Sequence, residues 1–287
     1  MDNAPISTAL WALHPRYLDA MQRREALPGV LSRLVAGRPT GRSLPAAAPE
    51  RAGTVLIVPV VGILAPRGMY GSVTPYEGIA DCVREGAADK TVTSIILAIR
   101  SPGGTVWGCE EAGDAIFAAR GVKPVVAVAD PCCFSAAYWL AAQAGKFYVT
   151  TSGEVGSVGV RSGHTDMSGF ENKVGMKTTL IASSADKIAA HPYAPLSEED
   201  RAEIQSGVDA ANRRFMLALA RGRRMRPIDV PRTHGSGRTF SAQRAMARGA
   251  IDGVATLRDV VARQGSSLVR LALMRRQAAL QELAATI

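Results

Sequence analysis

Short apolar segments alternate with amphipathic segments between residues 54 and 182. The apolar segments are β-branched or continuously apolar, as expected for strands that are covered on both faces. They comprise residues 55–64, 94–100, 124–130, 146–150 and 177–182, and helices are predicted over residues 75–88, 106–119, 135–144 and 168–174. Strands that alternate with helices in this way indicate βαβ units and an α/β fold.

A longer helix is predicted from Ser197, where Ser-Glu-Glu-Asp is a variant of the capping box. Apolar residues then recur at 204, 208, 211, 215 and 219 and form one stripe that we expect to pack in the core. A loop follows over residues 226–237, then a helix from Ser241 and a last helix over about residues 266–285. On the other side of the α/β region, a helix is predicted over residues 15–25 and a Gly/Pro/Ala-rich linker over residues 37–49.

The chain therefore divides into three parts. Residues 1–50 are expected to form an N-terminal arm and linker, residues 51–262 the main domain, and residues 263–287 a C-terminal helix. A chain of 287 residues with 47 % hydrophobic and 21 % charged residues has the composition of a soluble globular protein.

The net charge of +9 arises in the last third of the chain, because residues 201–287 hold 16 arginines, no lysine and six acidic residues. Such an excess is compatible with a nucleic-acid surface. No aromatic residue is interleaved with the arginines from Arg221 to Arg232. We therefore expect solvated faces of Arg-rich helices, and no nucleic-acid partner.

No targeting or membrane segment is evident. The longest apolar run, from Val55 to Ala65, is too short to span a bilayer, and no basic stretch followed by an apolar one begins the chain. The four cysteines form neither a disulfide ladder nor a metal-binding CxxC pair, and are predicted to be reduced and buried; they are Cys82, Cys109, Cys132 and Cys133. These features predict a cytoplasmic protein with no metal or cofactor.

Candidate chemistry begins at Ser135, which lies between a predicted buried strand and a helix of small residues. A hydroxyl at the start of a helix lies near free backbone N–H groups and the positive end of the helix dipole, which favour a developing negative charge. Serine is a weak nucleophile by itself, so a catalytic role requires a base and an oxyanion site.

The base is sought first among the four histidines, His14, His164, His191 and His234. None is paired with an acid in a recognisable motif, so a Ser-His-Asp triad stays open without support. Lysine is the second option, because a desolvated lysine loses its proton near neutrality whereas arginine does not. Among only six lysines, Lys187 follows a predicted strand amid small and apolar residues. It is the candidate base, with an ordinary surface lysine as the alternative.

Two glycine-rich loops are candidates for the rest of the site. Gly103 and Gly104 directly follow a strand in Arg-Ser-Pro-Gly-Gly-Thr, where consecutive glycines let backbone N–H groups approach a ligand. The second loop, residues 151–160, contains Ser157, whose hydroxyl is suited to holding a nearby amine in position.

Four fragments of the chain, in this order, resemble the signal peptide peptidase A family of serine proteases, in the Clp protease/crotonase-like superfamily. They are a strand ending in Ser-Pro-Gly-Gly, then Ser-Ala-Ala-Tyr-Trp-Leu-Ala from Ser135, Gly-Ser-Val-Gly-Val around Ser157, and Lys187 followed by Pro-Tyr-Ala-Pro-Leu-Ser-Glu-Glu. Ser135 precedes Lys187 by 52 residues and Ser157 by 22, spacings similar to the family's. Residues 239–252 resemble its closing helix, so that the resemblance covers about residues 54–262.

Within that family the chain is most similar to the bacteriophage head-maturation branch, the minor capsid protein C-like proteases. The similarity lies in Ala-Leu-Trp-Ala-Leu-His-Pro-Arg-Tyr-Leu at residues 9–18 and His-Pro-Tyr-Ala-Pro-Leu-Ser at residues 191–197. The chain departs from the family around the serine. Phe134 stands where the family has a small residue, and Ala136 and Ala137 stand where it has glycines.

The resemblance implies a spiral of ββα units and an endopeptidase with a Ser–Lys dyad. Ser135 would be the nucleophile, Lys187 its base and Ser157 the residue that orients the lysine, with an oxyanion site formed by the N–H groups of Gly103, Gly104 and Ala136. It also implies a ring-shaped homo-oligomer, in which serine and lysine can come from neighbouring subunits; whether Ser135 and Lys187 pair within one chain or between chains stays open. The substrate would be a capsid, portal or scaffold protein, and the location the host cytoplasm or procapsid.

Three other functions stay open. A crotonase-like acyl-CoA enzyme would use an acid, and Glu110, Glu111 and Asp114 follow the Gly-Gly turn, although their helix predicts a solvated face. A soluble bacterial relative of signal peptide peptidase is the second alternative. A non-catalytic capsid assembly or scaffold protein is the third.

Overall fold

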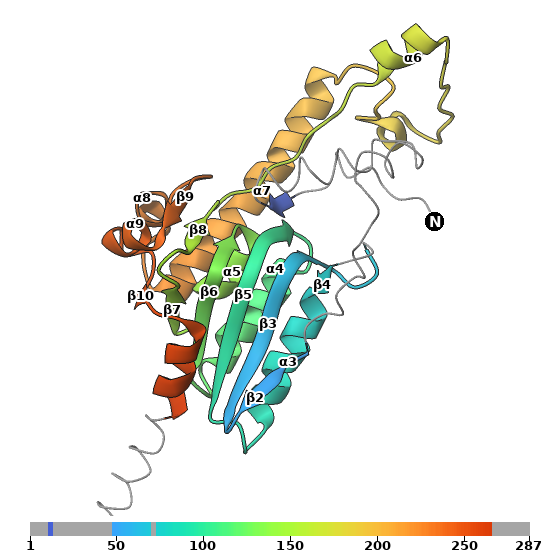
Figure 1. The fold of residues 1–287 in the computed structure, drawn as a ribbon. Coiled ribbons are helices and arrows are strands. Elements are labelled where there is room, and N and C mark those ends of the chain that lie inside the picture. Colours follow the sequence, from blue (N-terminus) through green and yellow to red (C-terminus); the bar gives the residue numbers. More distant parts are fainter. Residues whose placement is uncertain (1–10, 14–47, 70–72, 266–287) are drawn as a thin grey trace, which may run out of the picture.

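The computed structural model describes residues 11–13, 48–69 and 73–265. Within these residues, ten strands form one sheet, with the order β10-β7-β6-β5-β3-β2 along its main path and with β1, β4, β8 and β9 attached to it. The central strands β3, β5, β6 and β7 run parallel (Figure 1). The strands are β1 (Trp11–Leu13), β2 (Glu50–Ala52), β3 (Val55–Ala65), β4 (Thr74–Pro75), β5 (Ser94–Thr105), β6 (Val125–Phe134), β7 (Lys146–Val149), β8 (Glu154–Gly156), β9 (Thr239–Ser241) and β10 (Gly253–Val254).

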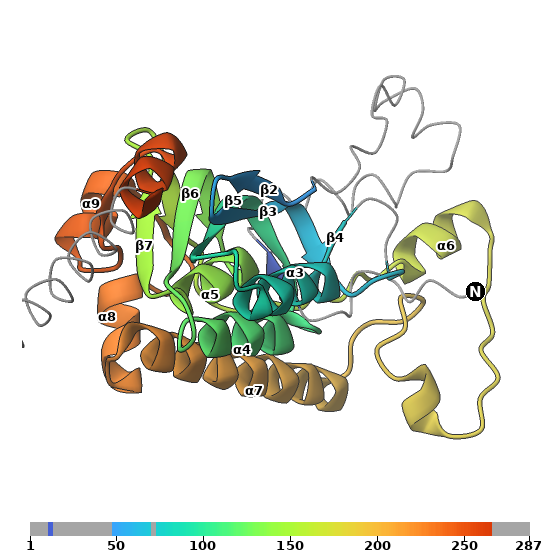
Figure 2. The ribbon, with the colours of Figure 1, turned by 90° about the horizontal axis from the view of Figure 1, so that it is seen from below.

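Helices cover one face of this sheet as a layer (Figure 2). They are α3 (Tyr76–Ala88), α4 (Cys109–Ala119), α5 (Ala136–Ala142) and α7 (Glu198–Arg223), while α6 (Ser168–Val174), α8 (Val230–His234), α9 (Ala242–Ala247) and the 3₁₀ helices η2 (Ala185–Ile188) and η3 (Pro227–Asp229) lie elsewhere. The buried helix α5 contacts α7 through Trp139, whose ring stacks on Phe215 with centroids 4.7 Å apart. This stacking fixes the central helix between the sheet and α7.

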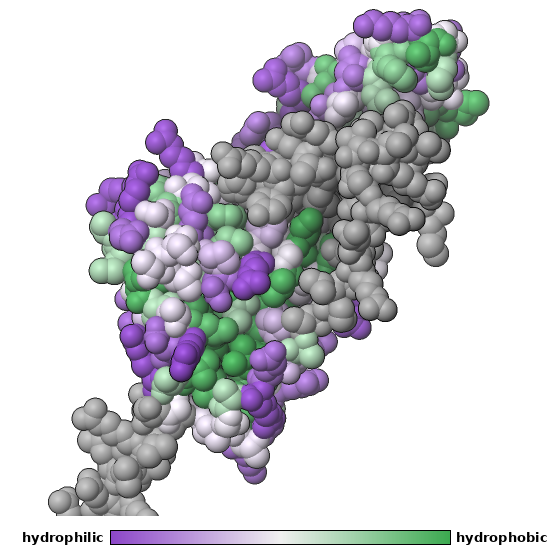
Figure 3. Space-filling model, in the orientation of Figure 1, coloured by the Kyte–Doolittle hydropathy of each residue, from purple (hydrophilic) through white to green (hydrophobic). Residues whose placement is uncertain are grey.

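The opposite face of the sheet is covered by a helix over residues 257–265. A second, smaller core joins it to the sheet, formed by Val55, Ile96, Val126, Val128, Ala255 and Val260. Beside this helix the face stays apolar in the space-filling view (Figure 3). The α/β prediction is therefore confirmed, while the spiral of ββα units and the three-part division of the chain stay predictions.

One part of the chain, residues 161–197, leaves the body of the molecule and is here named the protruding segment. It carries α6 and η2 and runs beside the first half of α7 (Figure 1). Large apolar side chains are exposed on it, Ile181 with 96 % of its surface. The others are Met167, Phe170, Val174, Met176, Leu180 and Tyr193.

Several predicted elements are confirmed. α6 matches its predicted range, and β7, α5 and α9 differ from theirs by one or two residues at an end. Ser197 caps α7, because its hydroxyl accepts a hydrogen bond from the Asp200 N–H at 3.0 Å. The apolar stripe of α7 is buried at Ala211, Phe215 and Leu219.

The predicted strand over residues 177–182 is wrong. These residues form no strand and are mostly exposed, because they belong to the protruding segment, where the described part of the chain offers no neighbouring strand for pairing. An apolar, β-branched pattern is therefore not enough for a strand without a partner in the sheet.

Five other predictions are corrected in their bounds or content. β5 and β6 continue four or five residues beyond their predicted ends, because the two strands still pair at Ser101 and Cys133 after a register shift. Helix α4 begins only at Cys109, after Gly108 with a φ of 83°. The loop over residues 226–237 contains η3 and α8, and the glycine-rich loop over residues 151–160 contains β8. The helix predicted over residues 15–25, most of the linker and the last helix lie outside the described residues.

The arginines of the last third take part in the fold. Arg221 forms an ion pair with Asp114 at 2.6 Å and Arg223 one with Asp252 at 2.8 Å, while Arg244 and Arg248 lie over the ring of Phe240. All four cysteines are free thiols, but only Cys109 and Cys133 are buried as predicted, whereas Cys82 and Cys132 are partly exposed. Among the described helices, none combines the length and apolar character needed to cross a bilayer.

A buried polar pair links α5 to α8. The Tyr138 hydroxyl lies 2.6 Å from Nδ1 of His234, which is only 1 % exposed. Burial, and then the charges of Arg223 and Arg248, lower the pKa of His234 from its ordinary value to about 4. The folded protein therefore holds this histidine neutral.

We predict that this histidine makes the protein less stable in acid. Between pH 6.5 and about 4 the unfolded chain binds a proton at His234 that the folded chain does not, so stability falls as the pH falls. The lowered pKa of His234 reduces the free energy of unfolding by about 3 kcal/mol at the acid end of this range. The free energy of unfolding, measured with denaturant from pH 7 to 4, should depend less on pH for His234→Gln than for the wild-type protein. His164→Gln is the control, and equal slopes for all three proteins would contradict the prediction.

Candidate active site

Ser135 lies at the junction of β6 and α5, one residue after the strand and one before the helix. Its backbone has φ 53° and ψ −116°, in a region that residues other than glycine rarely adopt. Such a conformation costs about 1–3 kcal/mol and persists only where neighbours enforce it. Here its N–H donates to the Gly156 carbonyl at 2.8 Å and its carbonyl accepts from the Trp139 N–H at 2.9 Å. The position of the serine is therefore fixed on both sides.

The hydroxyl of Ser135 faces the loop that follows β8. The residue is 1 % exposed, and Oγ donates to the Gly159 carbonyl across 3.4 Å, at the long limit of a hydrogen bond. A long bond of this kind holds the hydroxyl only weakly. The oxygen is therefore positioned without being strongly engaged.

The Gly-Gly sequence of β5 lies at the same level of the sheet as the serine. β5 and β6 pair at Ser101 and Cys133, and two residues further along these parallel strands are Gly103 and Ser135. A Cβ on Gly104 would lie 1.8 Å from the carbonyl oxygen of Leu64 in β3. Only glycine permits this approach, so the packing of β5 on β3 requires glycine at position 104.

The predicted oxyanion donors differ in their availability. The Gly103 N–H donates to Ser101 Oγ at 3.1 Å, and that hydroxyl donates in turn to the Gly62 carbonyl at 2.7 Å. Ala136 is the first residue of α5, so its N–H has no acceptor within the helix. The role of Ser101 was missed by the sequence analysis, although the residue lies within the Ser-Pro-Gly-Gly fragment.

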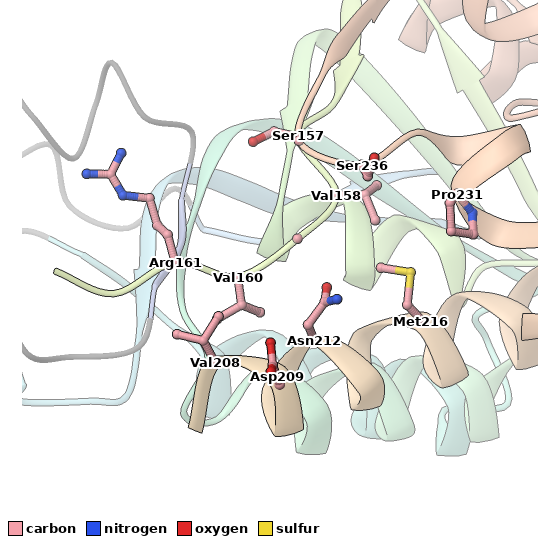
Figure 4. Close-up of a pocket in the computed structure, with 12 residues that line it drawn as sticks. Ser157, Val158, Val160, Arg161, Val208, Asp209, Asn212, Met216, Pro231 and Ser236 are labelled. Atoms are coloured by element: carbon pink, nitrogen blue, oxygen red, sulfur yellow. The ribbon is translucent and has the colours of Figure 1, made fainter. Parts of the chain in front are cut away.

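Ser157 lies across a cavity of about 470 Å³ from helix α7. The cavity also takes in Gly159, whose carbonyl accepts the hydrogen bond from Ser135. Asp209, Asn212 and Met216 of α7 line its opposite wall (Figure 4). These three residues were missed because they flank the apolar stripe of α7, and the sequence pattern gives no signal that this flank lines a cavity.

Lys187 is not brought to Ser135 within one chain. It lies exposed on η2, in the protruding segment, far from the start of α5 (Figure 1). Within the described residues its ammonium group has no hydrogen bond or ion pair. The orienting role predicted for Ser157 therefore has no lysine to act on within this chain.

The other lysines fall into two groups. Lys90, Lys123 and Lys146 lie just before or at the amino ends of β5, β6 and β7, whereas Ser135 follows the carboxyl end of β6. Lys173 and Lys177 belong to the protruding segment with Lys187. Every lysine near the Ser135 end of the sheet would thus have to come from a protruding segment.

Histidine is not placed as the base either, among the described residues. Nε2 of His164 lies 3.0 Å from the His191 carbonyl, His191 Nδ1 accepts from the Tyr193 N–H, and His234 is paired with Tyr138. His14 lies outside the described residues. A Ser-His-Asp triad gains no support.

The acids considered for an acyl-CoA enzyme lie on α4, as predicted, and form a solvated face. Glu110 faces Arg214 at 3.3 Å and Asp114 faces Arg221 at 2.6 Å, with about half of each acidic side chain exposed. Neither acid points to a buried catalytic pocket.

Comparison with known proteins decides the family. Residues 118–270, more than half of the chain, match peptidase family S49. The chain belongs to peptidase family S49. The matched region contains Ser135, Ser157 and Lys187, and the resemblance seen in the sequence motifs is confirmed.

The relatives of this S49 protein include two phage proteins. It is 35 % identical over 170 residues to the head-tail preconnector protein GP5 of Enterobacteria phage P21, covering 58 % of this chain and 34 % of that protein. It is 34 % identical over 165 residues to capsid assembly protease C of Escherichia phage lambda, covering 56 % of this chain and 38 % of that protein. A putative signal peptide peptidase SppA of Enterococcus faecium is 26 % identical over 174 residues, 60 % of this chain and 50 % of that protein. The S49 chain thus spans about a third of the length of the two phage relatives.

We predict that Gly104→Ala strongly destabilises the S49 domain. The added methyl group would collide with the Leu64 carbonyl, and forcing apart β5 and β3 should cost about 3 kcal/mol or more. Urea unfolding measures this loss. Gly207→Ala is the matched control, because Gly207 lies in α7 with no neighbouring atom within 4 Å of a Cβ, and alanine there should stabilise by up to about 1 kcal/mol. Equal stabilities of the two variants would contradict the close packing of β5.

Proposed function

We propose that the chain is a serine endopeptidase in which Ser135 attacks the peptide carbonyl and Lys187 of a neighbouring copy accepts its proton. The observation that carries the proposal is the placement of Ser135, held in a strained conformation at the carboxyl end of β6. Strained residues of this kind concentrate at active sites. Membership of peptidase family S49 supports the same reaction class.

The proposed reaction has two stages. A neutral Lys187 amine takes the proton of Ser135 as Oγ forms a bond to the substrate carbonyl carbon, and the carbonyl oxygen becomes an oxyanion. The N–H groups of Ala136, Gly104 and Gly103 would receive this oxyanion, the last after exchange of its bond to Ser101. Each such donor typically lowers the barrier by about 3–4 kcal/mol. The amine of the leaving peptide takes the proton from Lys187, and water then hydrolyses the acyl-enzyme.

The distribution of lysines favours a base from another chain. Three lysines lie at the opposite end of the sheet and three on the protruding segment. A second copy whose protruding segment reaches over Ser135 would therefore supply the amine. Of the three lysines on that segment, Lys187 has the family's spacing from the serine.

The surface of the protruding segment supports such an assembly. Its exposed apolar side chains include Phe170 on α6 and Met176 and Ile181 in the chain that follows this helix. Apolar surface is visible at this end of the molecule in Figure 3. Apolar patches of this kind mark contacts with other proteins. A ring of identical copies would bury them and at the same time complete each active site.

The substrate proposed is a protein of the phage head. The relatives from phages P21 and lambda are named for head-tail preconnection and capsid assembly, so we infer that this chain cuts a capsid, portal or scaffold protein in the procapsid or host cytoplasm. A bacterial signal-peptide-peptidase-like role is the alternative, supported by the similarity to the Enterococcus protein.

The dyad between chains predicts complementation of inactive variants. Ser135→Ala and Lys187→Ala should each abolish cleavage of capsid or portal protein with the fold intact. Co-assembled in equal amounts, they should recover about a quarter of wild-type activity, since that share of interfaces in a directional ring joins an intact serine to an intact lysine. The readout is new N-termini mapped by mass spectrometry.

Lys177→Ala is the matched control, because Lys177 is another exposed lysine of the protruding segment, and it should keep wild-type activity. Activity in Lys187→Ala alone would overturn the role of the lysine. Inactive variants that fail to complement would place the dyad within one chain. Inactivity of the wild-type assembly on every capsid protein would favour a non-catalytic assembly role.

A further inference from the structure

A short strand near the N-terminus lies against the glycine sequence of the candidate site. β1 pairs antiparallel with the end of β5, with Trp11 opposite Thr105, Ala12 opposite Gly104 and Leu13 opposite Gly103. It is the dark blue strand near the end of β5 in Figure 1. The family match does not reach it, because that match begins at residue 118.

The edge that β1 occupies is created by the same feature that positions Ser135. On one side, β5 pairs with β3 as far as Gly104. On the other side, its pairing with β6 ends at the bridge between Ser101 and Cys133, because β6 then turns into α5 at Ser135. Beyond that bridge the edge of β5 is left open, and β1 fills it. A strand seated there therefore lies in the place that β6 vacates, directly beside the candidate nucleophile.

We propose that β1 occupies the place where an extended substrate peptide pairs with Gly103–Thr105, so that the N-terminal region is an internal competitor for the active site. The inference rests on the proposed peptidase function for the identity of the substrate. An extended peptide that adds to a sheet edge is held by main-chain hydrogen bonds. Such bonds form with almost any sequence, so a segment of the protein itself and a peptide from another protein fit the same edge.

Occupation by both strands at once is excluded, because each backbone group at the edge of β5 pairs with one neighbouring strand. β1 also has an advantage over a free peptide. It belongs to the same molecule as β5, so its effective concentration does not fall on dilution. A substrate must displace it, and the apparent affinity is lowered by the fraction of molecules whose edge is open.

Proline substitutions in the full chain test this competition, because proline donates no hydrogen bond to a strand. Two variants, here named the β1 variants, are made: the double substitution Trp11→Pro/Leu13→Pro and the single substitution Ala12→Pro. Between them they remove every backbone N–H donor of β1. Ala48→Pro is the matched control, since Ala48 is exposed and belongs to no strand. If β1 leaves the edge of β5 free in about a tenth of wild-type molecules or fewer, kcat/KM for a fluorogenic peptide should rise about tenfold or more in the β1 variants. The value of kcat should stay unchanged. The control should match wild type, and intact mass should verify that the N-terminal region is retained.

A binding measurement separates this inference from the proposed function. All proteins are prepared with Ser135→Ala, so that no peptide is cut, and the probe is a fluorescent peptide with the sequence of residues 9–18. Its Kd, measured by anisotropy, should be about tenfold lower or more for the β1 variants than for the Ala48→Pro control. Suppose that the β1 variants bind the peptide more tightly, but that no protein that retains Ser135 hydrolyses the fluorogenic peptide. This result would support the competition and overturn the peptidase function. Equal Kd values in all proteins would overturn the competition, whatever the activity.

Discussion

The close approach of β5 to β3 at Gly104 is the constraint on which the site depends. A side chain at that position would occupy the space of the Leu64 carbonyl. With glycine there, β5 continues past its last bridge to β6 and presents backbone at the level of Ser135. The turn of β6 into α5 then leaves one edge of β5 open. The placement of Gly103 and Gly104 thus depends on this packing contact, while the turn of β6 into α5 places Ser135 and Ala136 and opens the edge of β5.

The same geometry separates the two halves of the proposed chemistry. The serine is buried in the body of the molecule, whereas Lys187 lies exposed on the protruding segment. In the proposed mechanism, a chain built in this way would hold its nucleophile without a base until another copy brings Lys187. Together with the proposed competition of β1 for the edge of β5, this arrangement would restrain an isolated chain in two independent ways. In the proposed mechanism, a second copy would supply the missing base and a substrate peptide would displace β1.

Much of this arrangement was predictable from the sequence, and the exceptions have physical reasons. The buried strands and the stripe of α7 follow from local apolar periodicity, and Ser135 was found because a strand-to-helix junction depends on nearby residues. The failed strand over residues 177–182 had the right local pattern but no partner. The pairing of β1 with β5 joins residues about ninety positions apart, and no local pattern encodes such a contact. The cavity wall on α7 was missed for the same reason.

Labelling with a fluorophosphonate tests whether Ser135 is an activated nucleophile. The assembled full chain would be treated with the reagent, digested and analysed by mass spectrometry for adducts on Ser101, Ser135 and Ser157. We expect an adduct on Ser135 alone, which is lost when the protein is unfolded before treatment. An adduct on either of the other serines, or none in the assembled protein, would contradict this expectation.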